Sequence, residues 1–406
     1  MNINLRSILR AGLLIAFLAT LTVASTQLEI ETAGTCDGAS VNLPFTDVGG
    51  GSTFFCSIAA AYFSGLTNGT TATTYNPTGN VTRDQMAAFI TRTMDQSIKR
   101  GSQRAALRQF WTTKTANDLA LTAVGSDPVA VESDGTDLWV ANQSSGTVSR
   151  VRASDGKLLD TWTGASNANG VLVARGKIFV LGGEDPGRLY QIDPTQPAGS
   201  VTVVSGALGI IPRGIAYDGQ YIWTANNGYP VGCFCTGSVS RVTLNPLTVN
   251  TFSTGFSLPS GIIYDGANIW VTDGVLAKLD SSGNIVTSCP VGNSPQSPAF
   301  DGTNIWVPNR DSNTVSVVRA TGALSGTVLA TLSGNGLSGP TQAAFDGERI
   351  LVTNQNGASV SLWRASDLTP VGTFPTGANT TPFGACSNGL NFWITFYNAA
   401  GKLARF

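Results

Sequence analysis

Residues 214–226 read Gly-Ile-Ala-Tyr-Asp-Gly-Gln-Tyr-Ile-Trp-Thr-Ala-Asn, and close variants of this segment recur as far as the end of the printed sequence. The segment consists of a short apolar run, an Asp-Gly pair, and a second apolar run that carries Trp223 and ends at Asn226. An Asp-Gly pair between two such runs predicts a β-hairpin, because glycine readily adopts the positive φ of a tight turn. One hairpin cannot bury its own faces, so the repetition predicts a fold in which the copies stack.

The spacing of the copies predicts a seven-bladed β-propeller, a mainly β fold. Successive turn glycines lie 36 to 47 residues apart, and blades of about 42 residues with four short strands have this period. These glycines are Gly135, Gly176, Gly219, Gly266, Gly302, Gly347 and Gly389. The strand after each turn keeps one large hydrophobe in register, which we expect to lie between stacked sheets. These side chains are Trp139, Phe179, Trp223, Trp270, Trp306, Leu351 and Trp393.

A closed ring needs a fourth strand for its last blade, because an open ring would leave exposed sheet edges. The last copy supplies only three strands, at residues 382–388, 392–396 and 401–406. Residues 118–124, just before the first copy, match the outer-strand segments of other copies. We therefore predict that residues 118–124 close the ring, that the propeller spans residues 118–406, and that Phe406 belongs to a sheet.

Bulk composition narrows the function classes. The chain has 406 residues, 42% of them hydrophobic, and a formal net charge of -1, so neither nucleic acid nor an anionic membrane surface is indicated as a partner. It contains no histidine, which removes the most frequent general base and metal ligand.

The first residues resemble an export signal. Arg6 and Arg10 precede an apolar run that continues through Val23, and small residues follow at Ala24 and Ser25. This order predicts a signal peptide over residues 1–25, with an uncleaved membrane anchor as the alternative. No later segment is apolar enough to span a bilayer. Residues 26–43 are polar and are expected to form a linker.

Residues 44–111 are expected to form a small helical module, followed by a linker at 112–117. Helical spacing at Phe55, Ile58 and Tyr62, and a capping box at Thr82 and Gln85, predict a helix, a loop and a second helix. Further motifs are Phe-Thr-Asp-Val at 45–48, Gly-Leu-Thr-Asn-Gly at 65–69 and Tyr-Asn-Pro at 75–77.

In these motifs the module resembles an S-layer homology (SLH) domain. The resemblance implies attachment to a cell-wall or envelope polysaccharide. The candidate contacts it implies are Thr82 and Arg83, at the start of the second helix, and Asp47. The alternative is that Thr82 only caps the helix, Arg83 is a solvated charge, and the module is a spacer or an assembly contact.

The repeats resemble the YVTN and NHL class of propellers, through Asp-Gly-x-x-Ile-Trp-Val-x-Asn at 301–309 and Thr-Val-Ser at 314–316. Streptogramin B lyases have a similar blade pattern, but their proposed chemistry needs a histidine. Lactonase-type propellers need several carboxylates around a cation, whereas Glu132 aligns only with apolar residues and Cys386 on the inner strands. We therefore expect no enzymatic activity, no cofactor and no metal, and we expect the turn aspartates to bond their own turns.

The face opposite the Asp-Gly turns carries the candidate recognition residues. Amides and a few arginines there suit a neutral polar ligand such as a glycan or a peptide. In the alternative, the repeated Asn ties each loop to its neighbour through backbone hydrogen bonds. The candidates are Asn142, Arg213, Asn226, Asp273, Asn309, Arg310 and Asn354.

The six cysteines are compatible with disulfides in an exported protein. Cys36 could pair with Cys56, and Cys233 or Cys235 could reach Cys289. Cys386 is expected to be a small buried hydrophobe.

The sequence as a whole favours a secreted, cell-surface or cell-envelope protein in which the module attaches and the propeller face binds a glycan or peptide. The first alternative is a propeller enzyme that acts in the central channel. The second is a periplasmic structural scaffold without wall affinity.

Overall fold

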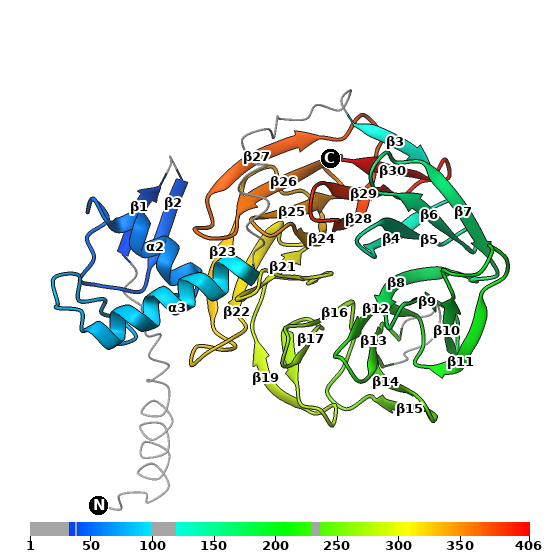
Figure 1. Ribbon diagram of the computed structural model, residues 1–406, viewed down its shortest axis with the longest axis horizontal. Helices are drawn as coiled ribbons and strands as arrows, with labels where there is room; N and C mark the ends of the chain where they lie inside the picture. The colour runs from blue at the N-terminus through cyan, green and yellow to red at the C-terminus, as the bar shows by residue number, and fades with distance from the viewer. Residues whose placement is uncertain (1–31, 37–38, 100–118, 229–235) are drawn as a thin grey trace, which may run out of the picture.

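The computed structural model describes residues 32–36, 39–99, 119–228 and 236–406. Seven four-stranded antiparallel sheets form a closed ring, with a small module of two helices and a hairpin beside it (Figure 1). The prediction of a seven-bladed propeller is confirmed. The expected signal peptide, the linker at 112–117 and the pair Cys233 and Cys235 lie outside the described residues.

The strands of blades 1 to 6 run from the central channel outward in chain order, and blade 7 takes its outermost strand from upstream of blade 1. Blade 1 is β4 (Pro128–Ser133), β5 (Asp137–Asn142), β6 (Thr147–Arg152) and β7 (Leu158–Thr163). Blade 2 is β8 (Ala168–Ala174), β9 (Lys177–Gly182), β10 (Gly187–Ile192) and β11 (Thr202–Leu208). Blade 3 is β12 (Pro212–Tyr217), β13 (Ile222–Asn226), β14 (Ser238–Leu244) and β15 (Leu247–Phe252).

The remaining blades repeat this arrangement. Blade 4 is β16 (Gly261–Tyr264), β17 (Ile269–Thr272), β18 (Leu276–Leu279) and β19 (Ile285–Cys289). Blade 5 is β20 (Ala299–Phe300), β21 (Asn304–Asn309), β22 (Thr314–Arg319) and β23 (Val328–Leu332). Blade 6 is β24 (Pro340–Phe345), β25 (Arg349–Asn354), β26 (Ser359–Arg364) and β27 (Pro370–Pro375). Blade 7 is β28 (Pro382–Ser387), β29 (Phe392–Phe396), β30 (Lys402–Arg405) and β3 (Ala120–Ala123).

Four of the five Asp-Gly turns are tied to the tryptophan of the strand that follows, and Asp346 of the fifth turn pairs with Arg349 instead. In blade 3, Asp218 Oδ1 accepts hydrogen bonds from the backbone N–H groups of Gln220 and Tyr221 at 2.8 and 2.6 Å, while Oδ2 accepts one from Trp223 Nε1 at 2.7 Å. Gly219 has φ of 95°, as the turn requires. The aspartates are therefore local structural groups, and the tryptophans that they hold are buried between sheets. The same contact recurs at Trp139, Trp270 and Trp306.

The ring closes where the sequence predicts. β3 pairs with β30 in antiparallel register from Ala120↔Arg405 to Ala123↔Lys402. Phe406 is buried, and its backbone exchanges hydrogen bonds with that of Phe392 at 2.8 and 3.0 Å. The last blade is therefore assembled from both ends of the propeller sequence.

The prediction that residues 26–43 form a linker is wrong for the second half of this segment. β1 (Thr32–Cys36) and β2 (Ala39–Leu43) form an antiparallel hairpin. Its buried side chains are few, notably Val41 and Leu43, because the hairpin is short and only one face packs on the module. A composition-based boundary therefore missed it.

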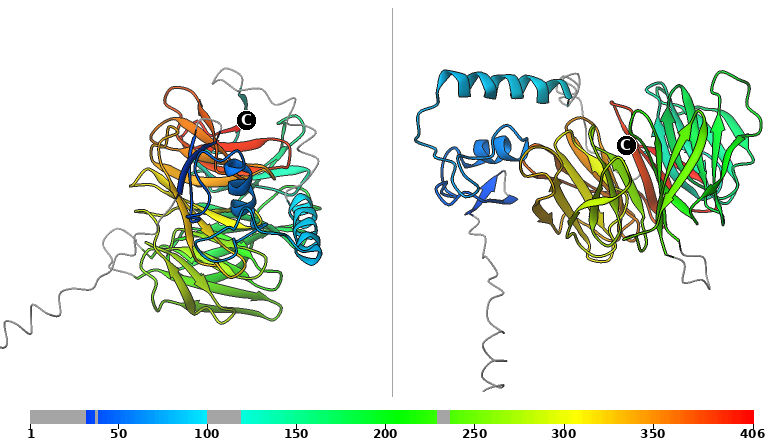
Figure 2. Two further views of the ribbon diagram at one scale, coloured as in Figure 1. Left: turned by 90° about the vertical axis from the view of Figure 1, so that its left-hand side faces the viewer. Right: turned by 90° about the horizontal axis from the view of Figure 1, so that it is seen from below.

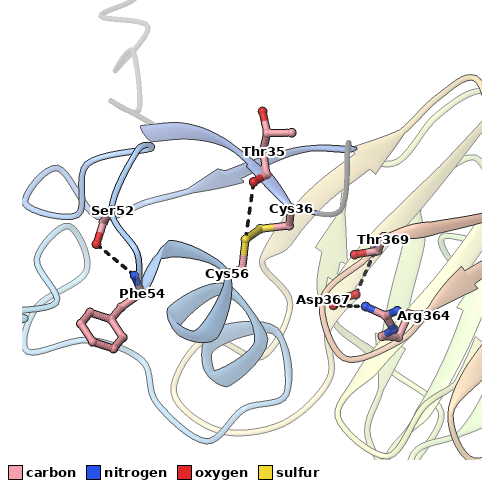
Figure 3. Close-up of a disulfide and its surroundings, with 8 residues drawn as sticks. All are labelled: Thr35, Cys36, Ser52, Phe54, Cys56, Arg364, Asp367 and Thr369. Atoms are coloured by element: carbon pink, nitrogen blue, oxygen red, sulfur yellow. Dashed lines mark hydrogen bonds and ion pairs between the residues drawn. A yellow bond between two sulfur atoms is a disulfide. The ribbon is translucent and has the colours of Figure 1, made fainter.

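Two helices complete the module, α2 (Phe55–Phe63) and α3 (Arg83–Lys99). A disulfide between Cys36 and Cys56, with a Cα–Cα distance of 5.6 Å, joins β1 to α2 (Figure 3). The capping box is confirmed: the backbone N–H of Thr82 donates to Gln85 Oε1 at 2.9 Å, and that of Gln85 to Thr82 Oγ1 at 3.4 Å. Within the described residues, neither helix combines the length and apolar character needed to cross a bilayer.

The module docks on blade 5 through the C-terminal end of α2 (Figures 1 and 2). Backbone carbonyls left over at the end of a helix need donors, and the blade supplies them. Asn304 Nδ2 donates to the carbonyl of Phe63 at 2.8 Å, and the buried Arg319 donates to that of Tyr62 at 2.6 Å. Apolar side chains of the module and of blades 5 and 6 form one continuous core cluster.

Candidate functional site

The docked module and the channel mouth lie at opposite ends of the blade strands. The module contacts the turn before β21 and the end of β22. The mouth is lined by residues at or just before the start of the first strand, or just after the second strand, of several blades. It is therefore open on the side away from the module.

The four predicted asparagines do not face a ligand. Asn142, Asn226, Asn309 and Asn354 are fully buried. In blade 1, Asn142 Nδ2 donates to Thr147 Oγ1 at 3.1 Å and to Ser149 Oγ at 3.0 Å, and the other three make the equivalent pair of contacts. Their assignment to the recognition face is wrong, because they cross-link the second and third strands of one blade. The repeated Asn is structural, although its partners are side-chain hydroxyls and not the expected backbone groups.

Asp273 is also engaged within the protein. Its carboxylate accepts hydrogen bonds from the backbone N–H groups of Ser257 and Leu258 at 2.7 and 2.6 Å. It therefore holds the loop between blades 3 and 4 and is not free for a ligand.

Arg213 and Arg310 do meet at the channel mouth. They line one cavity of about 400 Å³, Arg213 from β12 and Arg310 from the loop after β21. Neither guanidinium forms an ion pair among the described residues, and no carboxylate lines this part of the cavity. Desolvation inside the channel and the charge of Arg310 lower the pKa of Arg213. The mouth therefore concentrates uncompensated positive charge.

Amides and an aromatic pair surround the two arginines. Tyr397 Oη donates to Gln143 Oε1 at 3.2 Å, and the rings of Tyr397 and Phe383 lie 5.6 Å apart between centroids. The buried Oε1 of Gln355 has no hydrogen-bond partner among the described atoms. Asn169 and Gln342 complete the polar lining. The mouth thus offers amide groups and a pair of tilted aromatic rings beside its positive charge.

Two sequence signals could have found this lining. The first signal is the residue that directly follows the second strand, one position beyond the buried asparagines. Because the side chains of successive strand residues alternate between the two faces of a sheet, this residue does not share the face of the asparagine. Its members in the mouth are Gln143, Gly183, Arg310, Gln355 and Tyr397. The second is the position six residues before each turn glycine, which supplies Val129, Arg213, Ser260, Gln296, Thr341 and Phe383.

A deeper part of the channel, about 340 Å³, contains Glu132 among the apolar inner-strand residues that the alignment predicted, including Ala216 and Ile263. Burial raises the pKa of Glu132 to about 7. Burial, and to a smaller extent the charge of the nearby Glu132, raises the pKa of the Cys386 thiol well above its usual range. Among the described residues no three His, Cys, Asp or Glu side chains gather as a metal-binding group.

We expect Glu132→Gln to stabilise the protein in a pH-dependent way. Below pH 4.5 the carboxyl is protonated in both the folded and unfolded states, so the substitution removes no charge. Between pH 4.5 and about 7 the unfolded state loses the proton first, so the wild-type chain loses stability that the variant keeps. Thermal melts should show similar Tm values at pH 4 and a higher Tm for the variant at pH 8, by up to about 3 kcal/mol in unfolding free energy. Equal melts at pH 8 would contradict the burial of this charge.

The module contains a groove of about 710 Å³ between α3 and the loop that precedes it, lined by Tyr75, Phe89 and Arg92. Val81 and Gln85 line it as well, but Thr82 and Arg83 between them do not. Thr82 caps α3, and Arg83 is exposed at the first turn.

Asp47 is occupied within the module. It accepts hydrogen bonds from the backbone N–H groups of Tyr75 and Asn76 at 2.8 and 2.7 Å. Although desolvation opposes them, these bonds lower the pKa of Asp47. Asp47 therefore shapes the loop beside the groove.

Among the remaining cysteines, Cys289 is a free, buried thiol whose pKa burial raises to about 11. The expected bond from Cys233 or Cys235 to Cys289 is thus not formed, since Cys289 has no disulfide partner. Cys386 is a free thiol as well, half-buried on the channel wall.

Fold and module together define a seven-bladed β-propeller that carries an SLH domain. Residues 44–87 match the S-layer homology domain family, whose members generally bind cell-wall polysaccharides, and this associates the protein with the cell surface or envelope. No curated protein matches the chain in sequence.

Solved structures of similar fold are propeller proteins. Virginiamycin B lyase from Staphylococcus aureus is 15% identical with a TM-score of 0.56, over 71% of this chain and 98% of the lyase. Hydrazine synthase from Kuenenia stuttgartiensis is 18% identical with a TM-score of 0.57, over 70% of this chain and 98% of the other. At these identities the similarity establishes the fold alone.

Proposed function

We propose that the protein is an exported binding protein of the cell envelope, in which the SLH domain attaches to wall polysaccharide and the propeller mouth binds a glycan or peptide. The observation that carries this proposal is the polar, positively charged cavity that opens away from the docked SLH domain. Attachment through the module would leave such a mouth accessible to a ligand.

Binding fits the residues of the propeller better than catalysis does. The sequence contains no histidine, so the chemistry proposed for the streptogramin B lyases lacks its base here. Glu132 is the single carboxylate on the deeper channel wall, whereas a lactonase-type cation site needs several oxygen ligands.

Wall attachment can be tested by sedimenting the full chain with purified cell-wall polysaccharide. We expect the protein to sediment and Arg83→Gln to weaken binding by roughly tenfold, because a charge-assisted hydrogen bond contributes about this much. Arg152→Gln removes an equal charge at the exposed end of β6 and is the matched control. A full chain that stays in the supernatant would favour the scaffold alternative, and equal binding by all three proteins would remove Arg83 from the site.

A further inference from the structure

Arg213 and Arg310, which form no ion pair among the described residues, leave a positive charge at the mouth that an anion would neutralise. Proteins neutralise buried or confined charges with opposite charges, and Arg213 and Arg310 point their charges into one cavity whose lining contains only neutral groups otherwise. Glu132 lines the deeper part of the channel together with Arg213 and does not line the mouth. The neutral ligand that the sequence led us to expect would leave this positive charge without a counter-charge.

We propose that Arg213 and Arg310 bind the carboxylate of an acidic glycan at the channel mouth. The inference rests on the proposed binding function and names its ligand class. A guanidinium presents paired donors to a carboxylate, and two of them, one from blade 3 and one from blade 5, can hold its two oxygens.

Other mouth residues favour a sugar as the carrier of this carboxylate. Gln355 lines the mouth, and its side-chain amide can hydrogen-bond to a sugar hydroxyl. The neighbouring amides of Gln143 and Asn169 hydrogen-bond to each other and can exchange these bonds with hydroxyls. Phe383 and Tyr397 present adjacent rings with one hydroxyl, which suits a ligand that is apolar on one face and polar at its edge. A volume of about 400 Å³ lies in the range of small-molecule sites.

The test measures binding of the full chain to three probes by calorimetry: a hexuronic-acid oligosaccharide, the same oligosaccharide with its carboxyl groups reduced to alcohols, and a glutamate-rich peptide. We expect binding to the first, at least tenfold weaker binding to the second, and weakening of the first by added salt. Stronger binding of the peptide than of the acidic oligosaccharide would overturn the choice of a glycan.

Substitutions assign the effect to the two arginines. Arg213→Gln and Arg310→Gln should each weaken acidic-oligosaccharide binding about tenfold or more. Arg213→Lys should lose less affinity than Arg213→Gln, because lysine keeps the positive charge but lacks the paired donors of a guanidinium. Arg152→Gln, at the other end of the blades, should change nothing, and equal Tm values will verify that all variants fold.

The outcomes separate this inference from the binding function itself. Equal affinity for the acidic and reduced oligosaccharides, unaffected by the arginine variants, would overturn the anion site while leaving a binding propeller. No binding of any probe, together with no hit on glycan and peptide arrays, would overturn both.

Discussion

Deletion of residues 402–406 is expected to abolish the folded state. These residues form β30 and the terminal Phe406, and β30 is the only strand that joins β29 to β3. Leu403 and Ala404 are completely buried and Phe406 is nearly so. Truncating Phe406 to Ala alone should cost about 3–5 kcal/mol. Losing the whole strand would therefore consume most of the roughly 5–15 kcal/mol that keeps a domain folded.

Circular dichroism melts and limited proteolysis of the truncated protein would show this loss. The matched control is Leu121→Thr, which changes an exposed side chain of β3 and keeps its backbone pairing, and it should stay within about 0.5 kcal/mol of wild type. If the truncated protein melted as cooperatively as the full chain and at the same temperature, closure through β3 would not be what holds the ring.

Replacement of Arg319 by Met is expected to release the SLH domain from blade 5. Arg319 is buried, donates to the carbonyl of Tyr62 and lies over the Tyr62 ring at 5.6 Å. A cation also interacts favourably with the negative end of the α2 dipole. Met retains much of the volume but removes the charge-assisted hydrogen bond to the Tyr62 carbonyl, which keeps only donors such as the backbone N–H of Gly65 within its own module. We expect a loss of about 1.5–3 kcal/mol from the docked arrangement.

The measurement is differential scanning calorimetry combined with proteolysis. The variant should show two thermal transitions, one for the module and one for the propeller, and faster cleavage in the α2 region. Arg405→Met is the matched control, because Arg405 also ends a third strand and lies over Trp393 at 6.0 Å but does not contact the module. A single unshifted transition in Arg319→Met would show that the apolar contacts alone hold the module.

Repeated local sequence patterns were sufficient to predict the propeller fold. The Asp-Gly turns, the tryptophans that follow them and the incomplete last copy predicted seven blades and the closing strand, because each depends on neighbours close in sequence or on a repeat count. The pairing of Cys36 with Cys56 was one open possibility, which the structure realises. The hairpin at 32–43 was missed because a short strand pair with few hydrophobes has the composition of a linker.

The candidate site shows why register matters more than residue type. The asparagines stood out because they recur, yet a residue that recurs in every blade is more easily explained by a structural need that every blade shares. The residues that line the mouth differ from blade to blade, so no repeat marks them. Their common feature is position, either directly after the second strand, as at Gln143 and Arg310, or six residues before the turn glycine, as at Arg213.

The sequence by itself determined the repeat, the number of blades, the source of the closing strand and the presence of the SLH module, since these follow from local patterns. Only the tertiary structure decided that the module docks on blade 5 and that Arg213 and Arg310 share one cavity. The docking bonds join Arg319 and Asn304 to backbone carbonyls more than two hundred residues earlier in the chain. Backbone carbonyls are present at every position and carry no sequence signature, and two arginines of different blades meet only because the ring brings the blades around one axis.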